Sequence, residues 1–241
     1  MRVRVYGFAF SHPVQCARAM LRHKGIEHSL ITIPPGAHPA IMRALGFPGG
    51  TVPGVVMGRR KIQGTLEISR ALEAIVPDPP LFPAEIRDEV HGTERWAEAT
   101  LQHVPRRAFR WALAHRQDVR EEASRRLGVP APRYAGLALG VPGRAFARLF
   151  GVTEAQVESD VRALPGWLDR ADALVAEGVI GGEQPNAADF QIGSTIAALG
   201  AFEDFQPLLE GRPVAAMADR HFRRPKVALP PFLPREWLGG G

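Results

Sequence analysis

The sequence predicts an α/β domain with a mixed four-stranded sheet in the order βαβαββα, followed by an all-α domain. Three observations predict this fold class. Short segments with strand-type and helix-type periodicity alternate over residues 1–76. A proline-rich segment over 77–84 has the composition of a linker. Over 85–241, the clear periodicity of the apolar residues is helical.

The first half of the N-terminal domain contains two predicted strand–helix pairs. Polar and apolar residues alternate over 2–6, which predicts a strand. Apolar residues at helical spacing over 12–24 predict a helix, with Pro13 in its first turn and Gly25 as its stop. A strand over 26–33 and a short helix over 38–45 complete a βαβα unit.

A hairpin and a third helix complete this domain. Residues 51–57 form a predicted strand with Pro53 near its start, and a turn at Gly58 leads into a second strand over 61–63. Thr65 begins a helix whose apolar residues fall on one face and which ends before Pro77. We therefore expect the domain boundary in the linker over 77–84.

The second domain is predicted to be helical with an irregular tail. Helical periodicity is present over 85–102, 106–127, 153–177 and 187–199. The segment 128–151 is rich in Pro, Gly and apolar residues, which indicates a loop or a broken helix. The tail from Gly211 onward carries several prolines and little periodicity.

The composition excludes several classes of protein. The 241 residues are 45% hydrophobic, which is enough for a sizeable core. No apolar run approaches the roughly 18 residues of a membrane-spanning helix, and the N-terminus lacks a secretory-signal pattern. The single cysteine, Cys16, cannot form an intramolecular disulfide, so we expect a cytoplasmic protein. The 30 basic and 25 acidic residues are interspersed, so we expect neither a nucleic-acid nor a membrane partner.

Three local motifs mark the chain. A serine, Ser11, stands directly before the first predicted helix in Phe-Ser-His-Pro-Val-Gln-Cys; Val52-Pro53 precedes a strand; and Gln-Gly-Thr-Leu-Glu-Ile leads into the third helix at Thr65. A further motif, Gln-Pro-Asn-Ala-Ala-Asp-Phe over 184–190, precedes a predicted core helix. Together with the element order, these motifs resemble the cytosolic glutathione transferase superfamily, as in a bacterial GST-like protein with a serine at the active-site position. The likeness covers nearly the whole chain.

This resemblance implies a thioredoxin-like N-terminal domain, a homodimer, and glutathione or another low-molecular-weight thiol as co-substrate, with no metal. It also implies a cis Val52–Pro53 bond. Thr65 is expected to contact the γ-glutamyl carboxylate or, alternatively, only to cap its helix. Gly64 stands where the family usually has an acidic or amide residue, which leaves the identity of the thiol open. The expected thiol-binding residues are His12, Pro13, Val52, Pro53, Gly64 and Thr65.

Ser11 is the predicted catalytic residue. A hydroxyl at a helix N-terminus can donate to a thiolate, and the terminal N–H groups and the positive end of the helix dipole favour the anion. The alternative is that Ser11 only caps the helix, and Tyr6 is the runner-up hydroxyl. Cys16 lies further along the helix and is predicted to be buried and inert. No Cys-x-x-Cys pair supports dithiol chemistry.

The leading hypothesis is a glutathione transferase-like enzyme that activates a thiol for addition to an apolar electrophile. The electrophile is expected between the domains near Trp96, Phe109 and Trp111, which are alternatively ordinary core residues. Asn186 and Asp189 are predicted to form a structural helix cap. The rival functions are a non-catalytic ligand-binding or protein-interaction protein of the same fold, and a thiol-dependent isomerase or lyase.

Overall fold

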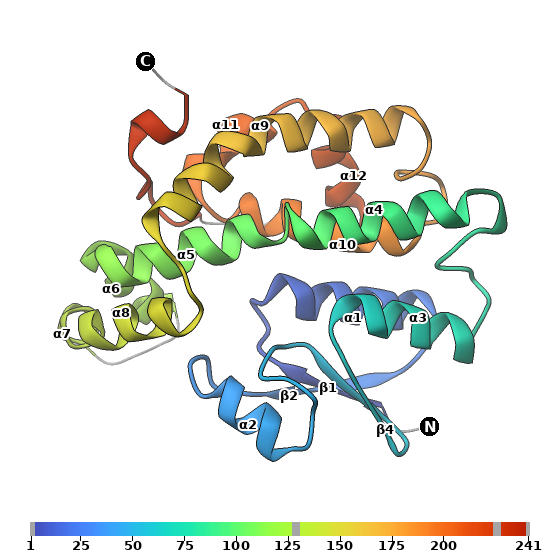
Figure 1. The fold of residues 1–241 in the computed structure, drawn as a ribbon, viewed down its shortest axis with the longest axis horizontal. Helices are drawn as coiled ribbons and strands as arrows, with labels where there is room; N and C mark the ends of the chain where they lie inside the picture. Colours follow the sequence, from blue (N-terminus) through green and yellow to red (C-terminus); the bar gives the residue numbers. More distant parts are fainter. Residues whose placement is uncertain (1–2, 127–130, 224–227, 240–241) are drawn as a thin grey trace.

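A sheet-based N-terminal part and a helical C-terminal part make up the chain, as the sequence predicts (Figure 1). The computed structural model describes residues 3–126, 131–223 and 228–239. Among these residues the helical part contains no strand, and its one strand-like contact is an isolated bridge between Phe202 and Leu229. No helix in the described ranges is long and apolar enough to cross a membrane.

The sheet has four strands in the order β2-β1-β3-β4. β1 runs parallel to β2, with Val5 opposite Leu30, and antiparallel to β3, with Val5 opposite Val55. β3 and β4 form the predicted antiparallel hairpin. The mixed sheet is therefore confirmed. Its strands are β1 (Val3–Gly7), β2 (His28–Thr32), β3 (Gly54–Met57) and β4 (Arg60–Gln63), of which β2 and β3 are shorter than predicted.

The two faces of the sheet carry different helices (Figure 1). α1 (His12–His23) and α3 (Thr65–Ile75) lie on the face toward the helical part, whereas α2 (His38–Ala44) lies on the opposite face. On the α2 side, Met42 and Phe47 pack against Val56 in a small separate core. On the other side, the apolar face of α1 joins a core that continues into the helical part. The two parts thus share one hydrophobic core.

Lys24 anchors the linker at the end of α1. Its fully buried ammonium group donates to Glu73 at 2.6 Å, to the carbonyl oxygen of Pro79 at 2.6 Å and to that of Pro77 at 3.2 Å. Glu73 also accepts the backbone N–H of Leu81 at 2.8 Å. A buried cation needs partners of this kind to offset its desolvation. The linker is consequently held against α1 and α3.

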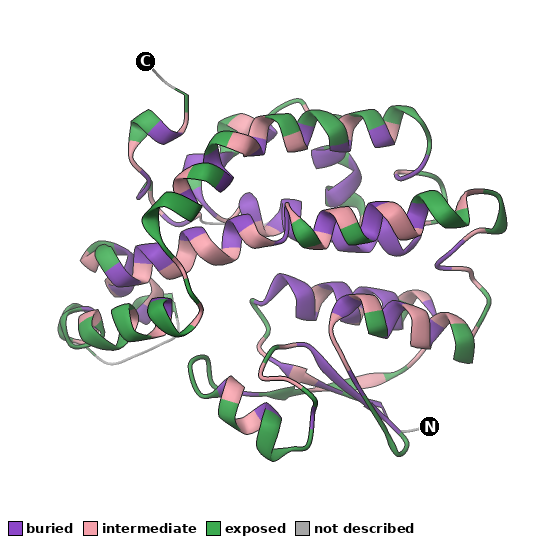
Figure 2. Ribbon diagram, in the orientation of Figure 1, coloured by how far each residue is buried: buried purple, intermediate pink, exposed green. Residues whose placement is uncertain are grey.

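α10 is the central helix of the C-terminal part. Nearly all of its residues are buried (Figure 2), and it packs on α1, α4 and α12. The predicted cap is confirmed: Asn186 accepts from the N–H of Ala188 and Asp189, and Asp189 accepts from the N–H of Asn186. The α-helices in the described residues of this part are α4 (Arg87–Ala99), α5 (His103–His115), α6 (Gln117–Arg126), α7 (Pro132–Ala138), α8 (Gly140–Leu149), α9 (Glu154–Ala176), α10 (Ala187–Leu199), α11 (Gln206–Leu209) and α12 (Pro213–His221).

The structure corrects the sequence prediction at two places in this part. The stretch of helical periodicity over 106–127 is divided between two helices, because α5 ends at His115 and α6 begins at Gln117. Between them Arg116 is extended, and it donates to Asp118 and to the carbonyl oxygen of Phe232. The tail is less irregular than predicted, since α12 begins with Pro213 in its first turn. The segment 128–151 is the broken helix of the two alternatives, with α7 and α8 in its described residues; 127–130 lie outside them.

Candidate functional site

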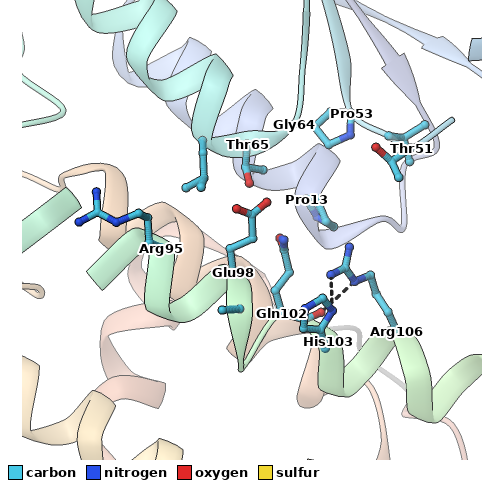
Figure 3. A pocket seen from close by; sticks show the side chains of 13 residues that line it. Pro13, Thr51, Pro53, Gly64, Thr65, Arg95, Glu98, Gln102, His103 and Arg106 are labelled. Carbon is cyan, nitrogen blue, oxygen red and sulfur yellow. Dashed lines mark hydrogen bonds between the residues drawn. The ribbon is translucent and has the colours of Figure 1, made fainter. Parts of the chain in front are cut away.

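A cleft of about 550 Å³ lies between the two parts of the chain (Figure 3). One wall comes from the N-terminal part, at the start of α1, the segment before β3 and the start of α3. The other wall comes from α4, α5 and the turn that joins them. The residues that line it are Pro13, Thr51, Val52, Pro53, Gly64, Thr65, Leu66, Arg95, Glu98, Ala99, Gln102, His103 and Arg106. The cleft therefore includes five of the six predicted thiol-binding residues.

Gly64 and Thr65 form the cleft wall where α3 begins. Gly64 has φ of 91°, a left-handed conformation that favours glycine and explains why no acidic or amide side chain stands there. Thr65 is 2% exposed, and its buried hydroxyl has no hydrogen-bond partner among the described residues. The hydroxyl does not cap the helix. The start of α3 therefore offers an unused donor and unpaired backbone N–H groups to the cleft.

The start of α1 lies next to the segment before β3. The Val52–Pro53 bond is cis, as predicted, and both residues line the cleft together with Pro13. Ser11 is 8% exposed and is not one of the lining residues. Its backbone N–H donates to Phe8 and its carbonyl oxygen accepts from Gln15, whereas its hydroxyl makes no capping bond. The side-chain hydroxyl thus has no capping role in α1.

His12 is the predicted thiol-binding residue that does not line the cleft. It is 7% exposed, and its Nε2 has no partner among the described residues. Burial, followed by the charge of Arg106, holds the pKa of His12 well below its ordinary value. His12 is therefore neutral at pH 7.

Tyr6 and Cys16 both point away from the cleft lining. Tyr6 packs edge-on against Phe47, on the α2 side of the sheet. Cys16 is fully buried, its thiol donates to Gln191 at 3.5 Å, and burial raises the pKa of this thiol well above its ordinary value. A neutral buried thiol is a poor nucleophile. This agrees with the prediction that Cys16 is inert.

The three aromatic residues predicted to face an electrophile do not line this cleft. Trp111 packs against Trp237, and its indole N–H donates to Glu154. Phe109 lies beside Phe202. Trp96 lies under the guanidinium group of Arg170. The structure does not bring these residues together with the thiol-binding residues.

The helical wall supplies polar residues that the sequence prediction missed. Glu98 lies in the last turn of α4, Gln102 in the turn between the helices, and Arg106 in the first turn of α5. In Figure 3 the carboxylate of Glu98 points toward Thr65, whereas the guanidinium group of Arg106 lies beside Pro13. The spacing of four between these polar residues is visible in the sequence, but α4 carries many other charged residues, so the spacing alone does not single them out.

A carboxyl group, Glu98, and a guanidinium group, Arg106, lie toward the two ends of the cleft. Burial raises the pKa of Glu98, and the nearby Arg106 opposes this effect. Burial lowers the pKa of Arg106 to about 10, so the group stays protonated at pH 7. Burial and the neighbouring arginines lower the pKa of His103 to about 4, so its imidazole is neutral. No cluster of metal-ligating side chains occurs in the described part of the chain.

The N-terminal part matches a known family in sequence. Residues 5–80 match the family model of the glutathione S-transferase N-terminal domain. None of the curated protein sequences compared with the chain matches it.

Solved structures extend the likeness to the whole chain. The fold is similar to that of the β-etherase LigF from Sphingobium sp. strain SYK-6, with a TM-score of 0.60 and 16% identity over 91% of this chain and 100% of that one. It is similar to a glutathione S-transferase from Rhodospirillum rubrum F11, with a TM-score of 0.56 and 17% identity over 98% of each chain. A theta-class glutathione S-transferase from Xanthomonas axonopodis pv. citri, with glutathione bound, gives a TM-score of 0.55 and 19% identity over 98% and 90%. The chain therefore has the glutathione transferase fold.

Proposed function

We propose that the chain is a glutathione transferase-like enzyme that binds glutathione, or a closely related low-molecular-weight thiol, in this cleft. The observation that carries the proposal is the buried, unpartnered hydroxyl of Thr65 at the start of α3. A buried hydroxyl without a partner costs free energy, which a ligand carboxylate at this position would recover. Proteins of the same fold with glutathione bound support the proposal.

A thiol tripeptide fits the polar groups of the cleft from end to end. Its γ-glutamyl carboxylate would accept hydrogen bonds from Thr65 and from the free N–H groups of α3. Gly64 has no side chain that could bind the α-ammonium group of the ligand. Glu98, whose carboxylate points toward Thr65, would pair with this ammonium group instead. The backbone of Val52 would pair with the peptide part. The thiol would then lie at the start of α1, near Ser11.

The reaction we propose is transfer of the thiol to an electrophile. The thiol releases its proton to solvent, and the resulting thiolate attacks an electrophilic carbon. A carbon–sulfur bond forms, and the leaving group departs with the electron pair of the broken bond. Ser11 is the proposed hydroxyl donor to the thiolate.

Calorimetric titration of the purified protein with glutathione tests the binding step. We expect one site per chain and at least tenfold weaker binding in Thr65→Val, because a donor to a charged group is lost without a change in side-chain shape. Matching urea midpoints of the two proteins would show that the variant is folded. Undetectable binding by the wild type, or equal affinities, would reject the proposed site.

An assay with a generic activated aromatic halide tests the transfer step. Turnover that depends on glutathione is expected of the enzyme. Binding without turnover against a panel of such electrophiles would instead support the alternative function, a non-catalytic ligand-binding protein of the same fold.

A further inference from the structure

Arg106 lies at the end of the cleft where α1 begins. It is half-buried and lines the cleft with Pro13, which stands in the first turn of α1. Figure 3 shows the guanidinium group beside Pro13 and away from Glu98 and Thr65. The group therefore occupies the thiol end of the cleft, not the end assigned to the γ-glutamyl carboxylate.

The hydrogen-bond partners of Arg106 are electrically neutral. Nε donates to the carbonyl oxygen of Gln102 at 2.9 Å, and Nη2 donates to Nδ1 of His103 at 3.0 Å. None of the ion pairs formed by the described residues includes Arg106. Its neighbour Arg107, by contrast, binds both carboxylate oxygens of Asp160. A half-buried guanidinium group without an anion attracts one strongly, because little water screens it.

The charged and titratable groups around Arg106 come from three helices. α1 contributes His12, α4 contributes Glu98, and α5 contributes His103, Arg107 and Arg110. Both histidines are neutral at pH 7, since burial and the arginines lower each pKa. Arg110 stacks on Phe150 at 3.9 Å. Glu98 is the carboxyl group that acts on Arg106 through its charge, and it points toward Thr65, away from the guanidinium group. With Arg107 paired to Asp160, Arg106 and Arg110 outweigh this single carboxyl group, so the thiol end carries net positive charge.

We propose that Arg106 is a further catalytic residue, whose guanidinium group stabilises the thiolate of the bound thiol by direct charge–charge contact. This inference rests on the proposed function, because it needs the thiol at the start of α1. A positive charge beside a thiol favours the thiolate, and each unit by which the thiol pKa falls increases the ratio of thiolate to thiol tenfold. The thiol proton leaves to solvent, so Arg106 itself neither gains nor loses a proton.

The test compares glutathione with S-methylglutathione, which has the same carboxylates but no ionisable thiol. The thiolate absorbance of bound glutathione, followed against pH, gives the thiol pKa in the wild type, Arg106→Gln and Arg106→Lys. We expect the pKa to rise by at least one unit in Arg106→Gln and to stay near the wild-type value in Arg106→Lys, which keeps the charge. S-methylglutathione should bind the wild type and Arg106→Gln with affinities within about twofold. It has no thiol to ionise, so a residue that acts only on the thiolate does not change its affinity.

Two results would overturn the inference while leaving glutathione binding intact. One is an unchanged thiol pKa in folded Arg106→Gln. The other is an equal loss of affinity for glutathione and S-methylglutathione, which would assign Arg106 to a carboxylate of the tripeptide. Arg95→Gln is the matched control, because it removes the same charge from an exposed position in the same cleft and should not raise the thiol pKa by a unit. If the wild type binds neither ligand, the proposed function fails as well.

Discussion

Ser11 stands at the start of α1 with a hydroxyl that makes no capping bond. We predict that Ser11→Ala lowers turnover roughly tenfold to a thousandfold, the effect of losing one donor to a developing anion. The pKa of the bound thiol should rise in the variant, because a hydrogen bond to the charged form is lost. Turnover measured against pH gives both quantities. Cys16→Ser is the control and should keep turnover near that of the wild type, since Cys16 is buried away from the cleft.

Equal rates and equal pH profiles for Ser11→Ala and the wild type would remove Ser11 from the reaction. The thiolate would then depend on Arg106 and on the N–H groups at the start of α1.

Glu94 makes the stability of the protein depend on pH. Its side chain is fully buried, with Oε2 accepting from Arg70 at 3.1 Å and Oε1 without a partner among the described residues. Burial raises its pKa from the ordinary 4.5 to about 7, against the opposing effects of Ser69 and Arg70. At a pH between these two pKa values, Glu94 is protonated in the folded protein and ionised in the unfolded chain. The free energy of unfolding contributed by Glu94 therefore falls as pH rises through this window, by up to roughly 3 kcal/mol.

Urea unfolding of the wild type and Glu94→Gln between about pH 5 and pH 8 tests this sign. The difference between the two proteins isolates Glu94, because other buried carboxyl groups act in the same direction and buried histidines in the opposite one. We predict that Glu94→Gln gains stability relative to the wild type as the pH rises. A difference that is constant with pH would show that Glu94 does not titrate in this window.

Individual site residues were predictable from sequence only where a local motif fixes them. The residues Val52, Pro53 and Thr65 stand beside the start of an element, so their positions in the cleft follow from the chain itself. Glu98 and Arg106 lie on the opposite wall, and their role depends on how α4 and α5 pack against α1 and α3. A charged stripe at a spacing of four has the same appearance on a solvent-exposed helix. Tertiary contact, not residue type, distinguishes the two cases.

Among the single elements, α10 is stabilised at its start by the capping residue Asn186. Asn186 is 4% exposed; its Oδ1 accepts two N–H groups of α10, and its Nδ2 donates to Val179 at 2.8 Å. We predict that Asn186→Ala lowers the free energy of unfolding by about 2 kcal/mol, the upper end of the range for a lost cap, because buried partners are left unpaired. Denaturant unfolding measures this loss, and affinity for glutathione should not change.

Thr153 provides the matched comparison. It forms the same kind of capping box at the start of α9, but it is exposed to solvent. Thr153→Ala should therefore cost less, about 0.5–1 kcal/mol, since water replaces the lost partner. A larger loss for Thr153→Ala than for Asn186→Ala would contradict this ranking.

The elements that sequence periodicity failed to predict are those shaped by distant contacts. The break at Arg116 separates α5 from α6, and it is stabilised by the carbonyl oxygen of Phe232, more than a hundred residues away. Nothing local to residues 106–127 indicates such a partner. α12 was missed because prolines surround it, although Pro213 stands in its first turn, where proline is favourable. Strong caps with long apolar faces, as in α10, were predicted correctly.

At the scale of the whole molecule, the cleft forms where the sheet-based N-terminal part and the helical C-terminal part pack against each other. α1 packs on α10, and the apolar core is continuous from the sheet to the helical part. Gln191 of α10 bonds both the thiol of Cys16 in α1 and the amide oxygen of Gln102 in the cleft wall. This contact places Arg106 beside Pro13 and Glu98 opposite Thr65 (Figure 3). Each wall alone lacks half of the polar groups that the proposed ligand needs.

A crystal structure of the protein with glutathione, grown at saturating ligand, tests the proposed site most directly. We predict that the γ-glutamyl carboxylate lies within hydrogen-bond distance of the Thr65 hydroxyl, and that the α-ammonium group lies beside Glu98. The sulfur atom should lie at the start of α1, within reach of the Arg106 guanidinium group. Glutathione bound outside the cleft, reversed so that its sulfur faces Thr65, or absent at saturating concentration would contradict the proposed function.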